Sequence, residues 1–208
     1  MKVYSLSGSV IRSNLERIGE LSDSLTSGDE RIIVVTGAGG LSKYQDASSG
    51  TEGEKDLIGI KATRVHAKLL ATEIDGANSV IPGRPDEVQE AASNHENVVT
   101  GGLVPGYSTD AVAATVAELL DADLYLATTV DGVYTEEPER EESERLEEVS
   151  IDRLRDLVSG NSSAGGYDLI DSTALDLIER SEIKTRVFRG SLENISSPDE
   201  CSGTDILV

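Results

Sequence analysis

Residues that could bind phosphate are concentrated in one stretch of the chain, residues 101–134. Glycines at its start allow a backbone to approach a ligand closely. Ser108 is placed to cap a helix, so that Ser108 and Thr109 present hydroxyls and free N–H groups to an anion. Asp110 follows in the first turn of that helix. The pattern predicts an anion site with a carboxylate beside it.

A second polar turn follows the short apolar strand expected at residues 124–128. Thr128, Thr129 and Asp131 lie where this strand ends. In open α/β sheets, ligands bind at the carboxyl ends of the strands. Two phosphate-binding elements so close together indicate a nucleotide and a second phosphorylated molecule.

Two charged residues near these turns each allow two interpretations. In the first interpretation, Asp110 does no more than complement the helix dipole, which contributes about 0.3–1 kcal/mol. A carboxylate beside phosphates is repulsive unless it holds a cation, so Asp110 also suggests Mg²⁺ or a positioned cationic side chain. Lys43 is either a surface lysine or a phosphate ligand. His66 and His95 are expected to be ordinary residues rather than ligands.

Apolar strands that alternate with helices must position these residues. The expected strands span residues 3–6, 31–36, 98–100, 124–128, 184–189 and 205–208, and the expected helices span residues 14–25, 57–74, 86–93, 151–158 and 171–180. Such alternation predicts a mostly parallel sheet with helices on both faces. In the helix at residues 57–74, the side chains expected to point inward are those of Ile58, Ala62, Val65, Leu69 and Leu70.

Between these elements we expect a polar loop with some helix at residues 42–55, a charged excursion at residues 135–148 and a loop at residues 161–166. Three glycine-rich turns follow apolar strands, at residues 8–9, 37–40 and 101–106. Phosphate binding explains three such turns better than turn-making alone. Neither GxxxxGK[ST] nor GxGxxG is present, which excludes a Walker-type NTPase and a typical dinucleotide-binding domain.

The composition is strongly acidic. The 208 residues include 39 Asp and Glu but only 18 Lys and Arg, for a net charge of −21. This balance argues against nucleic acid or an anionic membrane as a main partner. Dispersed acids with few lysines favour a protein adapted to concentrated salt, although an ordinary acidic cytosolic protein is the alternative.

Cysteine content and apolar runs narrow the class further. With Cys201 as its single cysteine, the chain has no intrachain disulfide and no cysteine-based metal site. We expect a soluble, cytoplasmic protein, because the first residues lack the apolar stretch of a signal peptide.

These motifs resemble the amino-acid-kinase superfamily, most closely the archaeal-type uridylate (UMP) kinases. The most specific pair is PGYSTDAVAA followed by TTVDGVY, at residues 105–114 and 128–134. Supporting motifs are SLSGSV, VVTGAGG, DLIGIKATR, YDLIDSTALDLIERSEIKT and the terminal GTDI. The resemblance covers nearly the whole chain.

The resemblance implies a fold and an activity. The fold would be an α/β protein, an αβα sandwich with a mostly parallel central sheet. One domain would hold an acceptor lobe at residues 1–120 and an ATP lobe at residues 121–208. The reaction would be ATP + UMP ⇌ ADP + UDP with Mg²⁺, whose protein ligands stay unassigned. Family members are typically homohexamers built from dimers.

The resemblance also assigns residues. Asp110 and Lys43 would serve the reacting centre, with Lys43 also at the ATP phosphates. Asp56 would bind the UMP nucleoside. The other ATP-binding residues would be Gly8, Ser9, Gly39, Thr128, Thr129, Tyr134 and Glu137. The other UMP-binding residues would be Ala38, Leu103, Val104, Pro105, Gly106, Tyr107, Ser108 and Thr109.

The chain departs from the family pattern at several positions. Ala38 adds a methyl group to a GGG turn, and Lys43 replaces an arginine and loses its bidentate contact with phosphate. Ser5 stands where many relatives have lysine, and Glu137 replaces an aspartate. Two alternatives stay open: a relative that phosphorylates another small acceptor, and a non-catalytic nucleotide-binding or oxoanion-storage protein.

Overall fold

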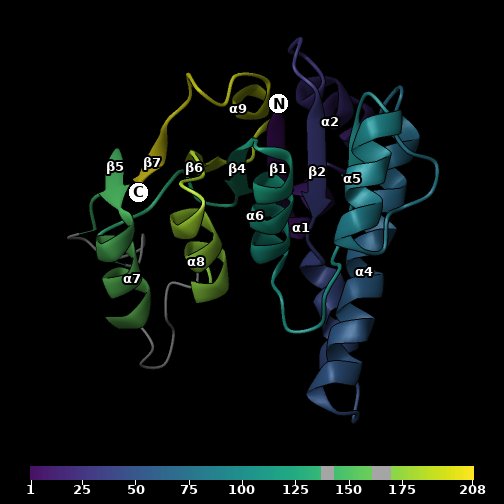
Figure 1. The fold of residues 1–208 in the computed structure, drawn as a ribbon, viewed down its shortest axis with the longest axis horizontal. Helices are drawn as coiled ribbons and strands as arrows, with labels where there is room; N and C mark the ends of the chain where they lie inside the picture. Colours follow the sequence, from purple (N-terminus) through teal and green to yellow (C-terminus); the bar gives the residue numbers. More distant parts are fainter. Residues whose placement is uncertain (137–142, 161–169) are drawn as a thin grey trace.

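One seven-stranded sheet forms the centre of the molecule (Figure 1). The computed structural model describes residues 1–136, 143–160 and 170–208. Within these ranges the strand order is β3-β2-β1-β4-β6-β7-β5. The strands are β1 Lys2–Leu6, β2 Ile32–Thr36, β3 Val98–Thr100, β4 Asp123–Thr128, β5 Glu148–Ser150, β6 Thr185–Arg189 and β7 Gly203–Leu207. All neighbours are parallel except β6 and β7, which confirms the predicted mostly parallel sheet.

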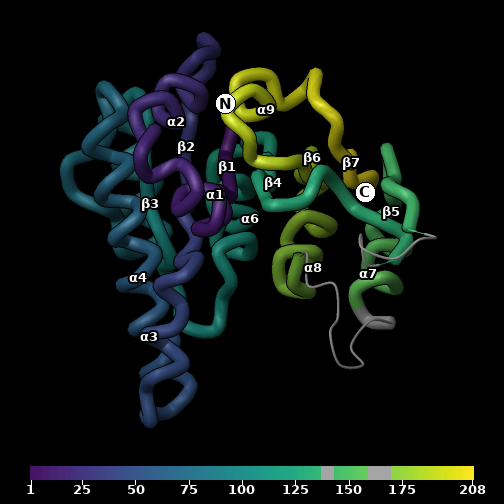
Figure 2. Tube along the Cα trace, turned by 180° about the vertical axis from the view of Figure 1, so that it is seen from behind, coloured from purple at the N-terminus to yellow at the C-terminus, as the bar shows by residue number. Residues whose placement is uncertain are grey.

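Helices cover both faces of this sheet, as expected. The helices in front in Figure 1 are α5 Pro85–Asn94, α6 Thr109–Leu120, α7 Ile151–Gly160 and α8 Ser172–Arg180. The helices on the face seen in Figure 2 are α1 Gly8–Ser13, α2 Ile18–Leu25, α3 Lys43–Asp46, α4 Glu52–Glu73 and α9 Leu192–Ser196. Two short 3₁₀ helices, η1 Leu15–Arg17 and η2 Gly39–Ser42, complete the described elements.

Alternation along the strands builds a core on each face. Val3 and Leu124 pack in one cluster with α5, α6 and α8. The next residues along the same strands, Tyr4 and Tyr125, pack in the other cluster with α1, α2 and α4. Successive strand side chains point to opposite faces, so a sheet covered on both faces needs apolar residues at both sets of positions.

The chain before and after the glycine turns is more helical than predicted. The turn expected at residues 8–9 is instead the start of α1, where Ser7 Oγ accepts a hydrogen bond from Ser9 N. The helix expected at residues 14–25 is divided into η1 and α2. Helix α4 begins five residues earlier than predicted, because Thr51 and Glu54 form a capping box.

The predicted inward face of α4 was wrong at Val65, whose side chain is 59% exposed. The buried residues Ile60, Thr63, Ala67 and Leu70 follow steps of three and four instead, so they share one face of the helix. The apolar pattern missed this face because Thr63 and its neighbour His66 are polar. Both are buried because their side chains form hydrogen bonds.

The charged segment at residues 135–148 lies partly outside the described residues, and the loop expected at residues 161–166 lies wholly outside them. On either side of the first gap, Tyr134 and Arg145 form an antiparallel bridge. Within the described part of the chain, no helix is long and apolar enough to cross a membrane.

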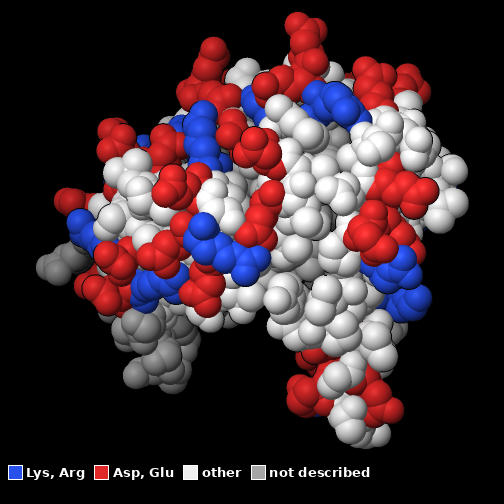
Figure 3. All heavy atoms as spheres, in the orientation of Figure 1, with Lys and Arg blue, Asp and Glu red and all other residues white. Residues whose placement is uncertain are grey.

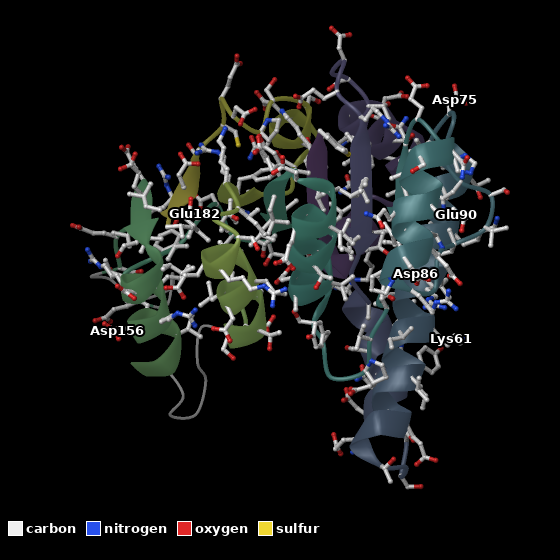
Figure 4. All side chains as sticks on the ribbon, in the orientation of Figure 1. Lys61, Asp75, Asp86, Glu90, Asp156 and Glu182 are labelled. Carbon is white, nitrogen blue, oxygen red and sulfur yellow. The ribbon has the colours of Figure 1, made fainter. Side chains whose placement is uncertain are left out.

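Acidic side chains are spread over the face in Figure 3, with few basic ones between them. Those labelled in Figure 4 come from separate parts of the fold and lie at its periphery: Asp75 after α4, Asp86 and Glu90 on α5, Asp156 on α7 and Glu182 after α8. The acidic residues of this face therefore come from several elements rather than from one segment.

Candidate active site

The carboxyl ends of three neighbouring strands are level with one another. Leu6 at the end of β1 is in register with Thr36 on β2 and with Ala127 on β4. Gly37 N donates a hydrogen bond of 2.9 Å to Leu6 O. The segments after β1, β2 and β4 therefore meet at one edge of the sheet.

A cavity of about 260 Å³ lies at this edge, and we call it the glycine cavity. Six of the residues that line it are Gly8, Gly37, Ala38, Gly39, Thr109 and Thr128. Since glycines present little but backbone, N–H groups and hydroxyls can contact a ligand here. Such a lining suits phosphate groups.

Glycine is required at this edge because the first two turns interlock. A Cβ atom on Gly8 would fall on the backbone nitrogen of Gly39 and lie 2.6 Å from Ala38 C. A Cβ atom on Gly37 would lie 2.7 Å from Gly8 N. Gly39 also has φ +52°, a conformation that side chains disfavour.

Asp110 reaches the glycine cavity from the first turn of α6. Ser108 caps this helix, accepting a hydrogen bond of 3.0 Å from Ala111 N, as predicted. Asp110 Oδ1 accepts a hydrogen bond of 2.5 Å from Ser5 Oγ. Desolvation raises the pKa of the Asp110 carboxyl to about 6, the Ser5 hydrogen bond opposes this change, and the charge of Asp171 adds to it.

The charge on Asp110 is not matched by a cation. Among the described residues no lysine or arginine forms an ion pair with Asp110. Ser5 stabilises the carboxylate only as a neutral donor. The arrangement therefore leaves Asp110 able to accept a cation that arrives with a ligand.

A second cavity of about 230 Å³, the loop cavity, adjoins the first. Six of the residues that line it are Ala38, Asp56, Val104, Tyr107, Ser108 and Thr109. Ala38 and Thr109 line both cavities, so the two meet at these residues. Two ligands bound side by side would approach each other there.

The loop between β3 and α6 forms one wall of the loop cavity and is held by side chains of α4. Asp56 Oδ2 accepts a hydrogen bond of 2.7 Å from Gly106 N, where φ is +81°. Thr63 Oγ1 accepts one of 2.7 Å from Gly102 N. His66 Nδ1 lies 2.8 Å from Gly37 O, and because a carbonyl only accepts, Nδ1 carries the hydrogen. Helix α4 thus braces two glycine turns.

Several predicted residues line neither cavity. Lys43 is exposed, with Nζ 5.8 Å from the ring centroid of Tyr44. Tyr134 donates a hydrogen bond of 2.8 Å to Asp131 Oδ1. Five more predicted residues are absent from both linings as the structure describes them: Ser9, Thr129, Pro105, Gly106 and Leu103, the last of which is buried in the core. Glu137 lies outside the described residues.

Two further residues at the site were not predicted from the sequence. Asp171 caps α8 and accepts a hydrogen bond from Ser108 Oγ, which links α8 to the loop before α6. Its position before a helix was a visible signal for a cap but not for this contact. Gln45 lines the loop cavity from α3, within a segment expected to be mostly loop. No motif marked it.

No group of three or more His, Cys, Asp or Glu side chains suitable for a metal ion occurs in the described ranges. The single carboxylate of Asp110 in the glycine cavity is nevertheless compatible with Mg²⁺. This ion commonly binds through one or two carboxylates together with substrate phosphates, and keeps several waters.

Comparison with known proteins supplies independent information on this chain. Residues 1–189 match the model of the amino acid kinase family. A uridylate kinase of Ignicoccus hospitalis is 40% identical over 185 residues, covering 85% of this chain and 84% of its own.

Solved structures agree with this match. The crystal structure of uridylate kinase from Archaeoglobus fulgidus is 36% identical, with a TM-score of 0.89 and coverage of 99% of both chains. A carbamate kinase from Giardia lamblia bound to AMP-PNP shares the fold at 14% identity. Its TM-score is 0.68, and the match covers 99% of this chain and 97% of that one.

Proposed function

The chain belongs to the amino acid kinase family, and on that premise we propose that it transfers the γ-phosphoryl group of ATP to UMP, giving ADP and UDP. The observation that carries this proposal is the meeting of two cavities at Ala38 and Thr109. One is lined by glycine turns that suit a triphosphate, and the other by a loop and α4. The uridylate kinases among the relatives give the acceptor its identity.

The proposed reaction needs no general base. The UMP phosphate is already an anionic nucleophile, so catalysis depends on in-line placement and on neutralising charge. We assign the γ-phosphate to the glycine cavity and the UMP phosphate to the junction at Ala38 and Thr109. Backbone N–H groups at Gly8 and Gly39 would bind the transferring oxygens. Lys43 would swing from Tyr44 to the phosphates, a movement that its exposed side chain permits.

Mg²⁺ is the cofactor that this chemistry implies. Asp110 is the residue that would hold it, because its carboxylate lines the glycine cavity and has no cation partner among the described residues. The bound ion would neutralise negative charge on the β- and γ-phosphates. Ser5 and Ser108 would keep the carboxylate and its helix in place.

The loop cavity is lined by residues of the first part of the chain alone, whereas both parts of the chain contribute to the glycine cavity. We propose that residues 1–120 form the UMP lobe and residues 121–208 the ATP lobe of a single domain. Thr128 lines the glycine cavity at the start of the second lobe. Thr129, Tyr134 and Glu137 follow it in the chain and are proposed to bind ATP farther from the junction.

We also propose a homohexamer built from dimers, in the cytoplasm where ATP and UMP are used. Leu57 and Val65 support association, because they are 52% and 59% exposed and lie on one face of α4. Lys61 lies between them on the same face (Figure 4). Light scattering of the wild type against Leu57→Asp tests the assembly.

The test of the function is acceptor-dependent release of ADP. Wild-type protein with ATP and Mg²⁺ is assayed against UMP, CMP, AMP, carbamate and acetylglutamate. Turnover that depends on UMP is the expected result. Turnover only with another acceptor would assign a different substrate, and ATP binding without turnover would assign a non-catalytic role.

A further inference from the structure

We propose that Gln45 determines acceptor specificity by binding a ribose hydroxyl of the acceptor nucleotide, next to Asp56. This inference rests on the proposed function. Gln45 belongs to α3, and its side chain lines the loop cavity together with Asp56 and Gly59.

Two contacts hold the Gln45 amide in place. Its Nε2 donates a hydrogen bond of 3.4 Å to Asp56 Oδ1. Its Oε1 lies 2.6 Å, and its Cδ 2.9 Å, from where a Cβ atom on Gly59 would be. The amide therefore rests against the bare backbone of α4 at Gly59.

Neither helix propensity nor backbone conformation explains why residue 59 is a glycine. It lies inside a 22-residue helix, where glycine costs about 0.5–1 kcal/mol relative to alanine. It has a helical conformation and does not need positive φ. The space that its missing side chain leaves is filled by the Gln45 amide, so we infer that glycine is kept there to seat this amide.

The seated amide lies beside the Asp56 carboxylate, and both side chains line the loop cavity. Asp56 Oδ2 accepts a hydrogen bond from Gly106 N and Asp56 Oδ1 accepts one from Gln45 Nε2, and each of these oxygens keeps a lone pair for a further donor. Gln45 Oε1 accepts no hydrogen bond from any residue that the structure describes. The 2′- and 3′-hydroxyls of a ribose are two adjacent donors, and they match two adjacent acceptors. The pair therefore fits a ribonucleoside monophosphate better than a deoxyribonucleoside monophosphate.

Three variants test the proposal. Gln45→Ala removes the amide, and Gly59→Ala displaces it while leaving Gln45 in the sequence. Gly53→Ala is the matched control, because Gly53 belongs to the same helix and has open space around it. The rate constant kcat/KM is measured for UMP, 2′-deoxy-UMP, 3′-deoxy-UMP and CMP.

We expect Gln45→Ala and Gly59→Ala each to lower kcat/KM for UMP by about three- to tenfold, the effect of one lost hydrogen bond. The loss should appear mainly in KM. The deoxy analogue that lacks the hydroxyl bound by Gln45 should be unaffected, and Gly53→Ala should behave as wild type.

Two results would overturn the proposal. An equal fall for UMP and both deoxy analogues would make Gln45 only a structural support of Asp56. A change in the preference for UMP over CMP without a change in ribose discrimination would place Gln45 at the base. Absence of UMP turnover in the wild type would instead refute the proposed function, so the two failures are distinguishable.

Discussion

The glycine cavity and the loop cavity meet at Ala38 and Thr109, but backbone atoms shape the first and side chains shape the second. The first is made of strand ends and interlocked turns, so its shape follows from backbone geometry. The second depends on side chains such as Asp56, Gln45 and Tyr107. A backbone cavity suits the phosphates that every kinase of the fold must bind. A cavity of side chains can change its ligand without a change of fold.

The largest effect should come from Gly8→Ala, which places a methyl group in the lining of the glycine cavity. The new Cβ atom meets main-chain atoms of Ala38 and Gly39, which cannot move aside as a side chain would. We expect at least a hundredfold loss of turnover and about 1–3 kcal/mol of destabilisation, measured by steady-state kinetics and urea unfolding. Gly19→Ala, with open space around it, is the control. Normal turnover in Gly8→Ala would refute the interlocking of the turns.

Asp110→Asn comes next and should separate activity from stability. We expect turnover to fall by about a hundredfold, because the cation site is lost. Ionising the buried carboxyl opposes folding, so the variant without Mg²⁺ should be more stable than wild type above pH 6, by roughly 1–3 kcal/mol.

The pH dependence of that gain has a definite sign. The folded pKa of about 6 lies above the ordinary value, so the penalty in the wild type grows as pH rises to 6 and vanishes below about pH 4. Urea unfolding in EDTA at pH 4 and pH 8 measures it. Equal stability of the two proteins at pH 8 would contradict the raised pKa of Asp110, and retained turnover would remove Asp110 from its assigned role.

Lys43 tests whether the junction needs a mobile cation. We expect Lys43→Ala to lower kcat about tenfold, the effect of losing one charged hydrogen bond. Lys43→Arg should retain or exceed wild-type activity, because guanidinium binds phosphate in a bidentate manner. Steady-state kinetics with saturating UMP and varied ATP measure both. If kcat were unchanged in Lys43→Ala, Lys43 would have no role at the junction, and charge would be neutralised by Mg²⁺ and backbone groups alone.

The smallest effect concerns the surface rather than either cavity. We propose that the dispersed negative charge is an adaptation to concentrated salt. Raising KCl from dilute to molar should raise the melting temperature by several degrees, since screening weakens repulsion among the exposed acids. Scanning calorimetry measures this shift. An unchanged melting temperature would contradict this proposal and favour the alternative, an ordinary acidic protein that is not adapted to salt.

The same contrast explains what could be predicted from the sequence. Strand ends and the glycines that follow them were predictable, because short apolar runs and glycines report local backbone geometry, although Gly8 begins helix α1 rather than a turn. The inward face of α4 was not, because its buried Thr63 and His66 are satisfied by hydrogen bonds to distant turns. Gln45 was missed for the same reason, since its partners Asp56 and Gly59 become neighbours only when α3 folds against α4.

The most direct test of the account is a crystal structure with UMP and a non-hydrolysable ATP analogue. We predict that the γ-phosphate occupies the glycine cavity and that the UMP phosphate meets it at Ala38 and Thr109. An oxygen of the UMP phosphate should lie opposite the leaving oxygen of the ATP analogue, in line for attack on the γ-phosphorus. A UMP phosphate bound away from this junction, or a γ-phosphate outside the glycine cavity, would contradict the account.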